Sequence, residues 1–110
     1  MIDVWEYLDH TGNSPFAVWF DDLNAPVAAK VTMAVTRLGR GNFSNVKGVG
    51  SGVLEYKIDF GTGYRIYLGE DGDCLVILLG GGTKKRQSTD ISHAVARWQD
   101  YKKRKKEGDR

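Results

Sequence analysis

The stretch that decides the fold spans residues 53–81 and reads VLEYKIDFGTGYRIYLGEDGDCLVILLGG. Apolar and polar residues alternate on both sides of GTG at 61–63, which predicts two antiparallel strands joined by a hairpin turn. EDGD at 70–73 then turns the chain into CLVILLGG at 74–81. This last run is apolar on both faces and is therefore typical of a strand in the interior of a sheet.

The alternation also divides the hairpin side chains between two faces of the sheet. One face is apolar and consists of Leu54, Tyr56, Ile58, Phe60, Tyr64, Ile66 and Leu68. The other carries Glu55, Lys57, Asp59, Arg65 and Tyr67. We expect helices to cover the apolar face alone, which would leave the polar face open to solvent.

Upstream of the hairpin, the sequence predicts a short strand over Ile2–Leu8 and then two helices. Ser14-Pro15 reads as an N-cap followed by the first helical residue. A second helix begins at Ala25-Pro26 and is stopped by Gly39 and Gly41. The buried stripes at helical spacing are Phe16, Trp19, Phe20 and Leu23 in the first helix, and Val27, Val31, Ala34, Val35 and Leu38 in the second. The short connection predicts a helical hairpin, and GVGSG at 48–52 predicts a flexible or turning entry to the sheet.

Downstream, Ser88 or Thr89 is positioned to cap a last helix. Its apolar stripe consists of Ile91, Ala94, Val95, Trp98 and Tyr101. The predicted order is therefore β-α-α-β-β-β-α, an α+β fold with the helical hairpin packed on a mostly antiparallel, twisted sheet. Residues 1–110 suffice for one domain, and the basic tail at 102–110 is expected to fray.

Composition excludes several classes of protein. No run of about 18 apolar residues is available to span a membrane, and the acidic start MIDVWEYLDH does not resemble a signal peptide, so we expect a cytoplasmic protein. Cys74 has no partner for a disulfide within the chain and is expected to be buried. His10 and His93 lack ligand spacing for a metal, and no nucleotide-binding or G-x-S-x-G motif is present, so no cofactor is expected.

Charge is distributed unevenly along the chain. Residues 1–29 hold five acids and no Lys or Arg, whereas residues 30–110 hold all 16 cations and nine acids. Such an asymmetry suits a protein that binds a polyanion on one side, although ordinary surface charge would give the same count.

The cations are expected to converge. Lys57 and Arg65 fall on one face of neighbouring strands, and Lys84, Lys85 and Arg86 precede a helix N-terminus, which favours anions. The glycines at 80–82 would clear the backbone for a phosphate. Alternatively, Lys57 pairs with Glu55 or Asp59, and the KKR run is a solvated loop.

Four segments together resemble the phage-derived addiction module killer protein branch of the RelE/ParE toxins. They are RLGRGNF (37–43), VKGVGSGVLE (46–55), DFGTGYRIY (59–67) and LLGGGTKKRQSTDI (78–91). The resemblance extends from about Phe16 to about Trp98 and is specific as a joint match. It implies the toxin of a type II toxin–antitoxin pair with a RelE-like (HigB-like) fold, neutralised by a cognate antitoxin and reaching DNA only through that antitoxin.

Members similar to RelE cut messenger RNA in the ribosome without a metal. Attack by the RNA's own 2′-OH requires a base, cations for the phosphorane charge and an acid for the leaving oxygen. The resemblance assigns charge stabilisation to Arg65, a catalytic lysine position to Lys57, and the cationic position after the last strand to Lys84 or Lys85.

Two departures leave the acid and the base open. Asp59 stands where the RelE strand pattern has a second lysine, and no tyrosine follows the KKR segment. His93 is a candidate acid, and Glu55 either orients Lys57 or acts as the base. Gln87 orders the loop or contacts RNA, for which Arg86 and Tyr67 are also candidates.

Other functions stay open as well. ParE-like members inhibit DNA gyrase by binding alone, and a degenerate relic would bind only its antitoxin. In the tail, Lys102, Lys103 and Arg104 either contact RNA or are merely solvated.

Overall fold

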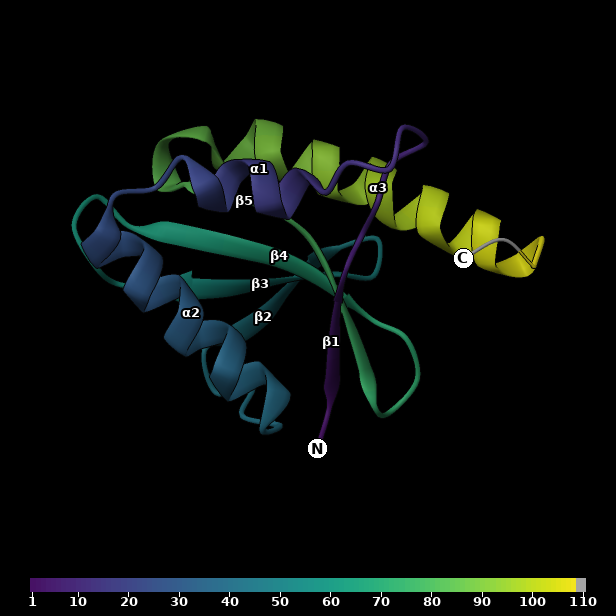
Figure 1. Ribbon diagram of the computed structural model, residues 1–110, viewed down its shortest axis with the longest axis horizontal. Helices are drawn as coiled ribbons and strands as arrows, with labels where there is room; N and C mark the ends of the chain where they lie inside the picture. The colour runs from purple at the N-terminus through teal and green to yellow at the C-terminus, as the bar shows by residue number, and fades with distance from the viewer. Residues whose placement is uncertain (109–110) are drawn as a thin grey trace.

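A five-stranded mixed sheet with helices on both faces forms the computed structural model, which describes residues 1–108 (Figure 1). The elements are β1 (Asp3–Glu6), α1 (Pro15–Asp21), α2 (Ala25–Gly39), β2 (Val46–Gly50), β3 (Val53–Ile58), β4 (Tyr64–Glu70), β5 (Leu75–Thr83), the 3-10 turn η1 (Lys84–Arg86) and α3 (Gln87–Lys106). The strand order is β1-β5-β4-β3-β2. Only the β1–β5 pair is parallel, so the predicted α+β class and mostly antiparallel sheet are confirmed.

The segment at 48–52 was predicted to be a flexible or turning entry to the sheet, and the structure has the turn but also an edge strand that was not predicted. Val46–Gly50 forms the edge strand β2, which pairs with β3. Ser51 and Gly52, both with positive φ, make the turn between the two strands. Two consecutive residues with positive φ are the signature of a tight hairpin turn, and the glycines that suggested flexibility in fact allow this geometry.

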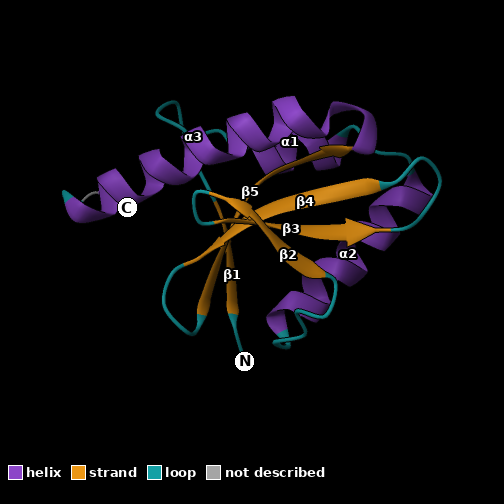
Figure 2. Cartoon of the chain, turned by 180° about the vertical axis from the view of Figure 1, so that it is seen from behind, coloured by secondary structure: helices purple, strands orange, loops and turns teal. Residues whose placement is uncertain are grey.

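The prediction of an open polar face is wrong, because the sheet is covered on both sides. Figures 1 and 2 view the molecule from opposite sides and show α1 and α2 on one face and α3 on the other. Phe16, Val31 and Leu38 pack with the apolar face of the sheet, while Ala94 and Trp98 of α3 pack with residues such as Tyr67 and Leu79 on the second. β5 is apolar on both faces, and such a strand needs a helical layer on each side.

The two N-terminal helices begin where their capping residues predict. The side chain of Ser14 accepts a hydrogen bond from the backbone N–H of Ala17 at 3.0 Å, and Asn24 accepts one from Val27 at 3.1 Å. The helices share one face of the sheet but do not form a closely packed hairpin. α1 lies against β5, whereas α2 contacts β1 and β3.

The last helix starts earlier and runs further than predicted. η1 leads directly into α3, whose N-cap is Arg86 and not Ser88 or Thr89. Residues 102–106, which were expected to fray, continue the helix, while residues 109–110 of the predicted tail lie outside the described residues. The tail is tied down because Arg104 contacts Asp100 at 2.7 Å and its guanidinium lies over the Tyr7 ring at 5.1 Å.

Two further features bear on the expectations from composition. Cys74 is exposed at the β4–β5 turn, not buried as predicted, because β5 begins only at Leu75. Within residues 1–108, no helix combines the length and the apolar character that a membrane span requires.

The glycines at 80–82 make room for helices and do not clear the backbone for a ligand. A Cβ atom on Gly80 would lie 2.7 Å from Nη1 of Arg97, and Cβ atoms on Gly81 and Gly82 would overlap Trp19 and Asp90. Arg97 and Asp90 belong to α3 and Trp19 to α1. The three glycines therefore let both helical layers approach the end of β5.

The close approach of α3 to β4 can be tested with a glycine pair. A Cβ atom on Gly69 would lie 2.6 Å from the Trp98 ring, whereas one on Gly48 would meet no atom within 4 Å. We expect Gly69→Ala to lower the free energy of unfolding by about 1–3 kcal/mol, measured by urea denaturation. Gly48→Ala is the matched control in another strand and should change it by less than about 0.5 kcal/mol. Equal stability of the two variants would contradict the packing of Trp98 on Gly69.

Candidate functional site

Three of the predicted cations, Lys57, Arg65 and Lys84, line one open depression of about 310 Å³ at the β3–β4 turn. The strand register places Lys57 opposite Arg65 and Arg65 opposite Gly82. The backbone N–H of Lys84 donates to the carbonyl of Gly63 at 3.3 Å, which ties η1 to the turn. The expected convergence of cations from two strands and the following junction is therefore present.

Gly63 lines this depression between two of the cations. A Cβ atom there would be 3.5 Å from Nη1 of Arg65 and 3.7 Å from the Cβ of Lys84. Its φ of 86° is one that glycine adopts without strain. Gly63 thus lies beside Arg65 and Lys84 without adding a side chain of its own.

Arg65 is held in place by a buried carboxylate. Its Nε lies 3.2 Å from Oε1 of Glu55, and the Nε2 of Gln87 donates to Oε2 of the same carboxylate at 2.7 Å. Glu55 is 0% exposed and Arg65 is 5% exposed. Nη1 of Arg65 has no hydrogen-bond partner among residues 1–108. The carboxylate therefore holds the guanidinium, and the buried Nη1 lies behind Gly63 at the wall of the depression.

This arrangement changes the expected roles of Glu55, Gln87 and Tyr67. Glu55 was expected to orient Lys57 or act as the base, but it contacts Arg65, and Lys57 instead pairs with Asp59 at 3.7 Å. Gln87 orders the site by bridging α3 to β3. Tyr67 is 1% exposed beneath α3, so the predicted contact with RNA is wrong. Burial, followed by the carboxylates of Glu55 and Asp90, raises the pKa of its phenol.

Asp90 adds a second, partly buried acid to this layer. Its carboxylate lies against Gly82 in the first turn of α3, and its Oδ2 is buried without a hydrogen-bond partner among the described residues. Burial raises the pKa of Asp90, although the charges of Arg86, His93 and Arg97 oppose the shift. The negative charge of Asp90 also lies in the first turn of α3, where the helix dipole stabilises it.

The remaining predicted residues are distributed over three places. Lys85 and Arg86 are exposed on η1 beside Lys84, but they do not line the depression. His93, the candidate acid, lines a different depression with Asp90, Arg97 and Trp19, and the structure does not bring it to Arg65.

Lys102, Lys103 and Arg104 lie far along α3 from the site. At about 1.5 Å per residue, Lys102 is roughly 22 Å from the start of the helix. The ammonium of Lys102 lies 5.7 Å from the centre of the Trp98 ring, and Arg104 is held by Asp100. The contact of Lys102 with Trp98 and the contact of Arg104 with Asp100 both serve packing. The segment is separate from the depression.

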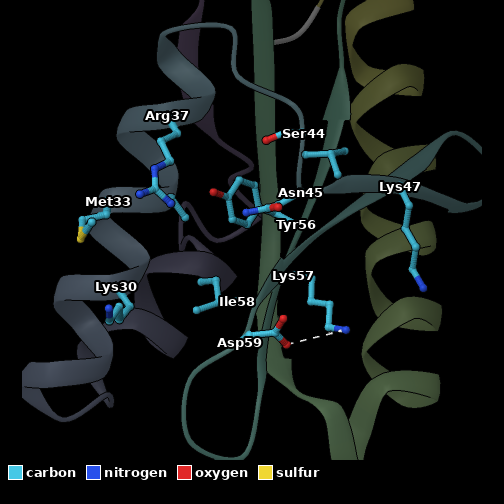
Figure 3. A pocket seen from close by; sticks show the side chains of 12 residues that line it. Lys30, Met33, Arg37, Ser44, Asn45, Lys47, Tyr56, Lys57, Ile58 and Asp59 are labelled. Atoms are coloured by element: carbon cyan, nitrogen blue, oxygen red, sulfur yellow. Dashed lines mark ion pairs between the residues drawn. The ribbon is translucent and has the colours of Figure 1, made fainter.

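A larger groove lies beside this depression, and it was not predicted from the sequence. It has a volume of about 570 Å³, lies between α2 and the β2–β3 edge, and shares Lys57 and Asp59 with the depression (Figure 3). Its other cations are Lys30, Arg37 and Lys47. The i to i+7 spacing of Lys30 and Arg37 on one side of α2 was an available signal, but their proximity to β2 depends on the unpredicted edge strand.

The geometry defines a small α+β domain with a cationic site over one end of its sheet. No family model matches the chain. It is 44% identical over 80 residues to an uncharacterized protein of Haemophilus influenzae (strain ATCC 51907 / DSM 11121 / KW20 / Rd), a match that covers 72% of this chain and 81% of that protein. The chain therefore belongs to the same family as this H. influenzae protein.

The ion pair between Glu55 and Arg65 predicts a large effect of removing one partner. Glu55→Gln would leave the buried guanidinium without its counter-charge, so we expect the free energy of unfolding to fall by about 3–5 kcal/mol. The double substitution Glu55→Leu with Arg65→Met removes both charges and should recover most of that loss. Chemical denaturation of the three proteins measures both effects, and a single variant as stable as the wild type would show that the pair is not buried in solution.

The raised pKa of Asp90 predicts a pH dependence of stability. The folded state binds the Asp90 proton more tightly than the unfolded state, so this group favours folding below its ordinary pKa and the contribution is lost as pH rises through the raised value. Asp90→Asn should therefore gain on the order of 1 kcal/mol relative to the wild type at neutral pH, and less in acid. Thermal unfolding across this range measures it, with exposed Asp59→Asn as the control. A stability difference between Asp90→Asn and the wild type that does not change with pH would argue against the raised pKa of Asp90.

Proposed function

We propose that the protein is the toxin of a type II toxin–antitoxin system and acts as a metal-independent, ribosome-dependent messenger RNA endonuclease in the cytoplasm. The observation that carries this proposal is the guanidinium of Arg65, which is paired with Glu55 and lines one depression together with Lys57 and Lys84. The resemblance of the sequence to RelE/ParE toxins supports the same function. The proposed partners are a cognate antitoxin, the ribosome and the messenger RNA.

The site is suited to stabilising a crowded phosphate. Positive groups preorganised around a developing phosphorane lower its free energy more than mobile ones, because no reorganisation is needed during the reaction. Arg65 is preorganised by Glu55 and Gln87. Lys57 and Lys84 are exposed and supply charge from opposite sides of the turn.

Proton transfer also has a candidate among the lining residues. The 2′-OH must lose its proton as it attacks the phosphorus, and the 5′ oxygen must gain one as the P–O bond breaks. Among residues 1–108, Asp59 is the only carboxylate that lines the depression, and its side chain is 83% exposed beside Lys57. We assign it the acceptance of the 2′-OH proton, in place of the buried Glu55, and the departing 5′ oxygen takes its proton from solvent water in the open depression.

Cleavage of a translated messenger RNA tests this assignment. We expect Lys84→Ala to reduce the cleavage rate by about 10²-fold, since it removes one cation from the transition state. Asp59→Asn should cause a loss of similar size, as expected for removing a proton acceptor. Primer extension on a translated reporter after induction measures both rates.

Lys106→Ala is the control for overall charge, because Lys106 is exposed at the far end of α3. Wild-type cleavage by Lys84→Ala would refute the site. Growth arrest without RNA cleavage, together with loss of supercoiling by purified gyrase, would instead support the gyrase-binding alternative, and absence of growth arrest would support a relic that binds only its antitoxin.

A further inference from the structure

The groove between α2 and the β2–β3 edge is the largest cavity described, and it has a different character from the site beside it. Its charged lining consists of four cations and one acid: Lys30, Arg37, Lys47, Lys57 and Asp59. In Figure 3, Lys30 and Arg37 extend from α2 on one side, while Lys47 and Lys57 extend from the sheet on the other. An elongated anion in the groove would therefore meet positive charge on the α2 wall, while the ammonium groups of Lys47 and Lys57 point away from α2 at the strand edge.

These cations are available to a ligand. Lys30 and Arg37 are exposed, and within residues 1–108 neither lies in an ion pair with a carboxylate. Lys47 lies 3.9 Å from Glu55 and its side chain is 66% exposed, so this contact is weak. Lys30 is also preoriented, because its ammonium lies 5.3 Å from the centre of the Phe60 ring.

The groove also presents groups that recognise more than charge. Asn45 and Ser44 offer hydrogen-bonding side chains, and the guanidinium of Arg37 points toward the ring of Tyr56 (Figure 3). Met33, 47% exposed, adds an apolar contact on the α2 wall. Amide and hydroxyl groups suit the edges of unpaired bases, and apolar and guanidinium surfaces suit their faces.

The position of the groove connects it to the Arg65 depression. Both cavities are lined by Lys57 and Asp59, and Phe60, which contacts Lys30, lines the depression as well. A chain that enters one cavity can continue into the other. The volume of about 570 Å³ is within the range of small-ligand sites and admits a strand of one or two nucleotides. Proteins read a duplex by inserting a helix or a strand into its grooves. This surface is concave and has no element to insert, so it does not suit a duplex.

We propose that this groove binds the nucleotides adjacent to the reacting phosphate, as an extended single strand of RNA. The proposal rests on the proposed function, since it names how the substrate reaches Arg65. Lys30 and Arg37 contact backbone phosphates, and Asn45 contacts a base. The cationic site therefore extends across the edge of the sheet to α2, and recognition requires several linked nucleotides.

Binding of a non-cleavable RNA tests the groove independently of catalysis. The probe is a fluorescent 2′-O-methyl RNA octamer, titrated by anisotropy over a series of salt concentrations. We expect Lys30→Gln with Arg37→Gln to weaken octamer binding by at least tenfold and to reduce the slope of log K against log salt by about 1.4, since each lost phosphate contact on a single strand contributes about 0.7. The affinity for a 2′-O-methyl nucleoside monophosphate, which is small enough for the depression alone, should stay within about twofold.

Lys105→Gln with Lys106→Gln is the control, because it removes the same charge from the far end of α3. Unchanged octamer binding by the groove variant, or an equal loss in the control, would overturn the proposal. An acidic peptide that competes with the octamer at equal charge and equal affinity would also overturn it, since it would indicate a protein partner. Octamer binding through the groove without cleavage of translated RNA would remove the proposed nuclease function and leave the groove assignment intact.

Discussion

The buried ion pair between Glu55 and Arg65 is the interaction on which the rest of the structure depends. Both charges lie in the layer beneath α3, where desolvation makes an unpaired charge costly. A domain of this size is stable by only about 5–15 kcal/mol, so the pair and the helix that covers it must be maintained together. Gln87 makes this link physical, because it joins the first turn of α3 to the same carboxylate.

The two ends of the sheet differ in charge, and the strand order explains why. The acidic N-terminal segment provides β1, while the cations of the groove flank β2 and β3 at the opposite edge. The uneven charge along the sequence therefore becomes an uneven field in space, which favours the approach of a polyanion to the β2–β3 edge. Lys57 belongs to both cationic cavities and lies at their junction.

Much of the fold could be predicted from local patterns, and the failures share one cause. The cap at Ser14, the start of α2 at Ala25-Pro26, the stripes of the helices and the β3–β4 hairpin follow from short-range rules, and the structure has them. Alternation assigned Glu55, Arg65 and Tyr67 to one face correctly, but it could not show that Glu55 and Arg65 neutralise each other across the strands. A charged residue in a strand reads as exposed unless its partner is known.

The candidate site was predictable in part for the same reason. Lys57, Arg65 and Lys84 converge because hairpin register and the strand-to-helix junction are local features. The groove was missed because Lys30 and Arg37 lie far in sequence from Asn45 and Lys47. Contact between them depends on how α2 crosses the sheet, which no local pattern specifies.

The three glycines at the end of β5 have a consequence for how the chain tolerates change. The space that a Cβ atom would occupy is filled by Arg97 at Gly80, by Trp19 at Gly81 and by Asp90 at Gly82. Any replacement at these positions adds atoms, so the segment is vulnerable to gain of volume, whereas ordinary core positions are vulnerable to its loss. A single substitution at one of these glycines can therefore inactivate the protein by pushing a helix away from the sheet, although no charged residue is replaced.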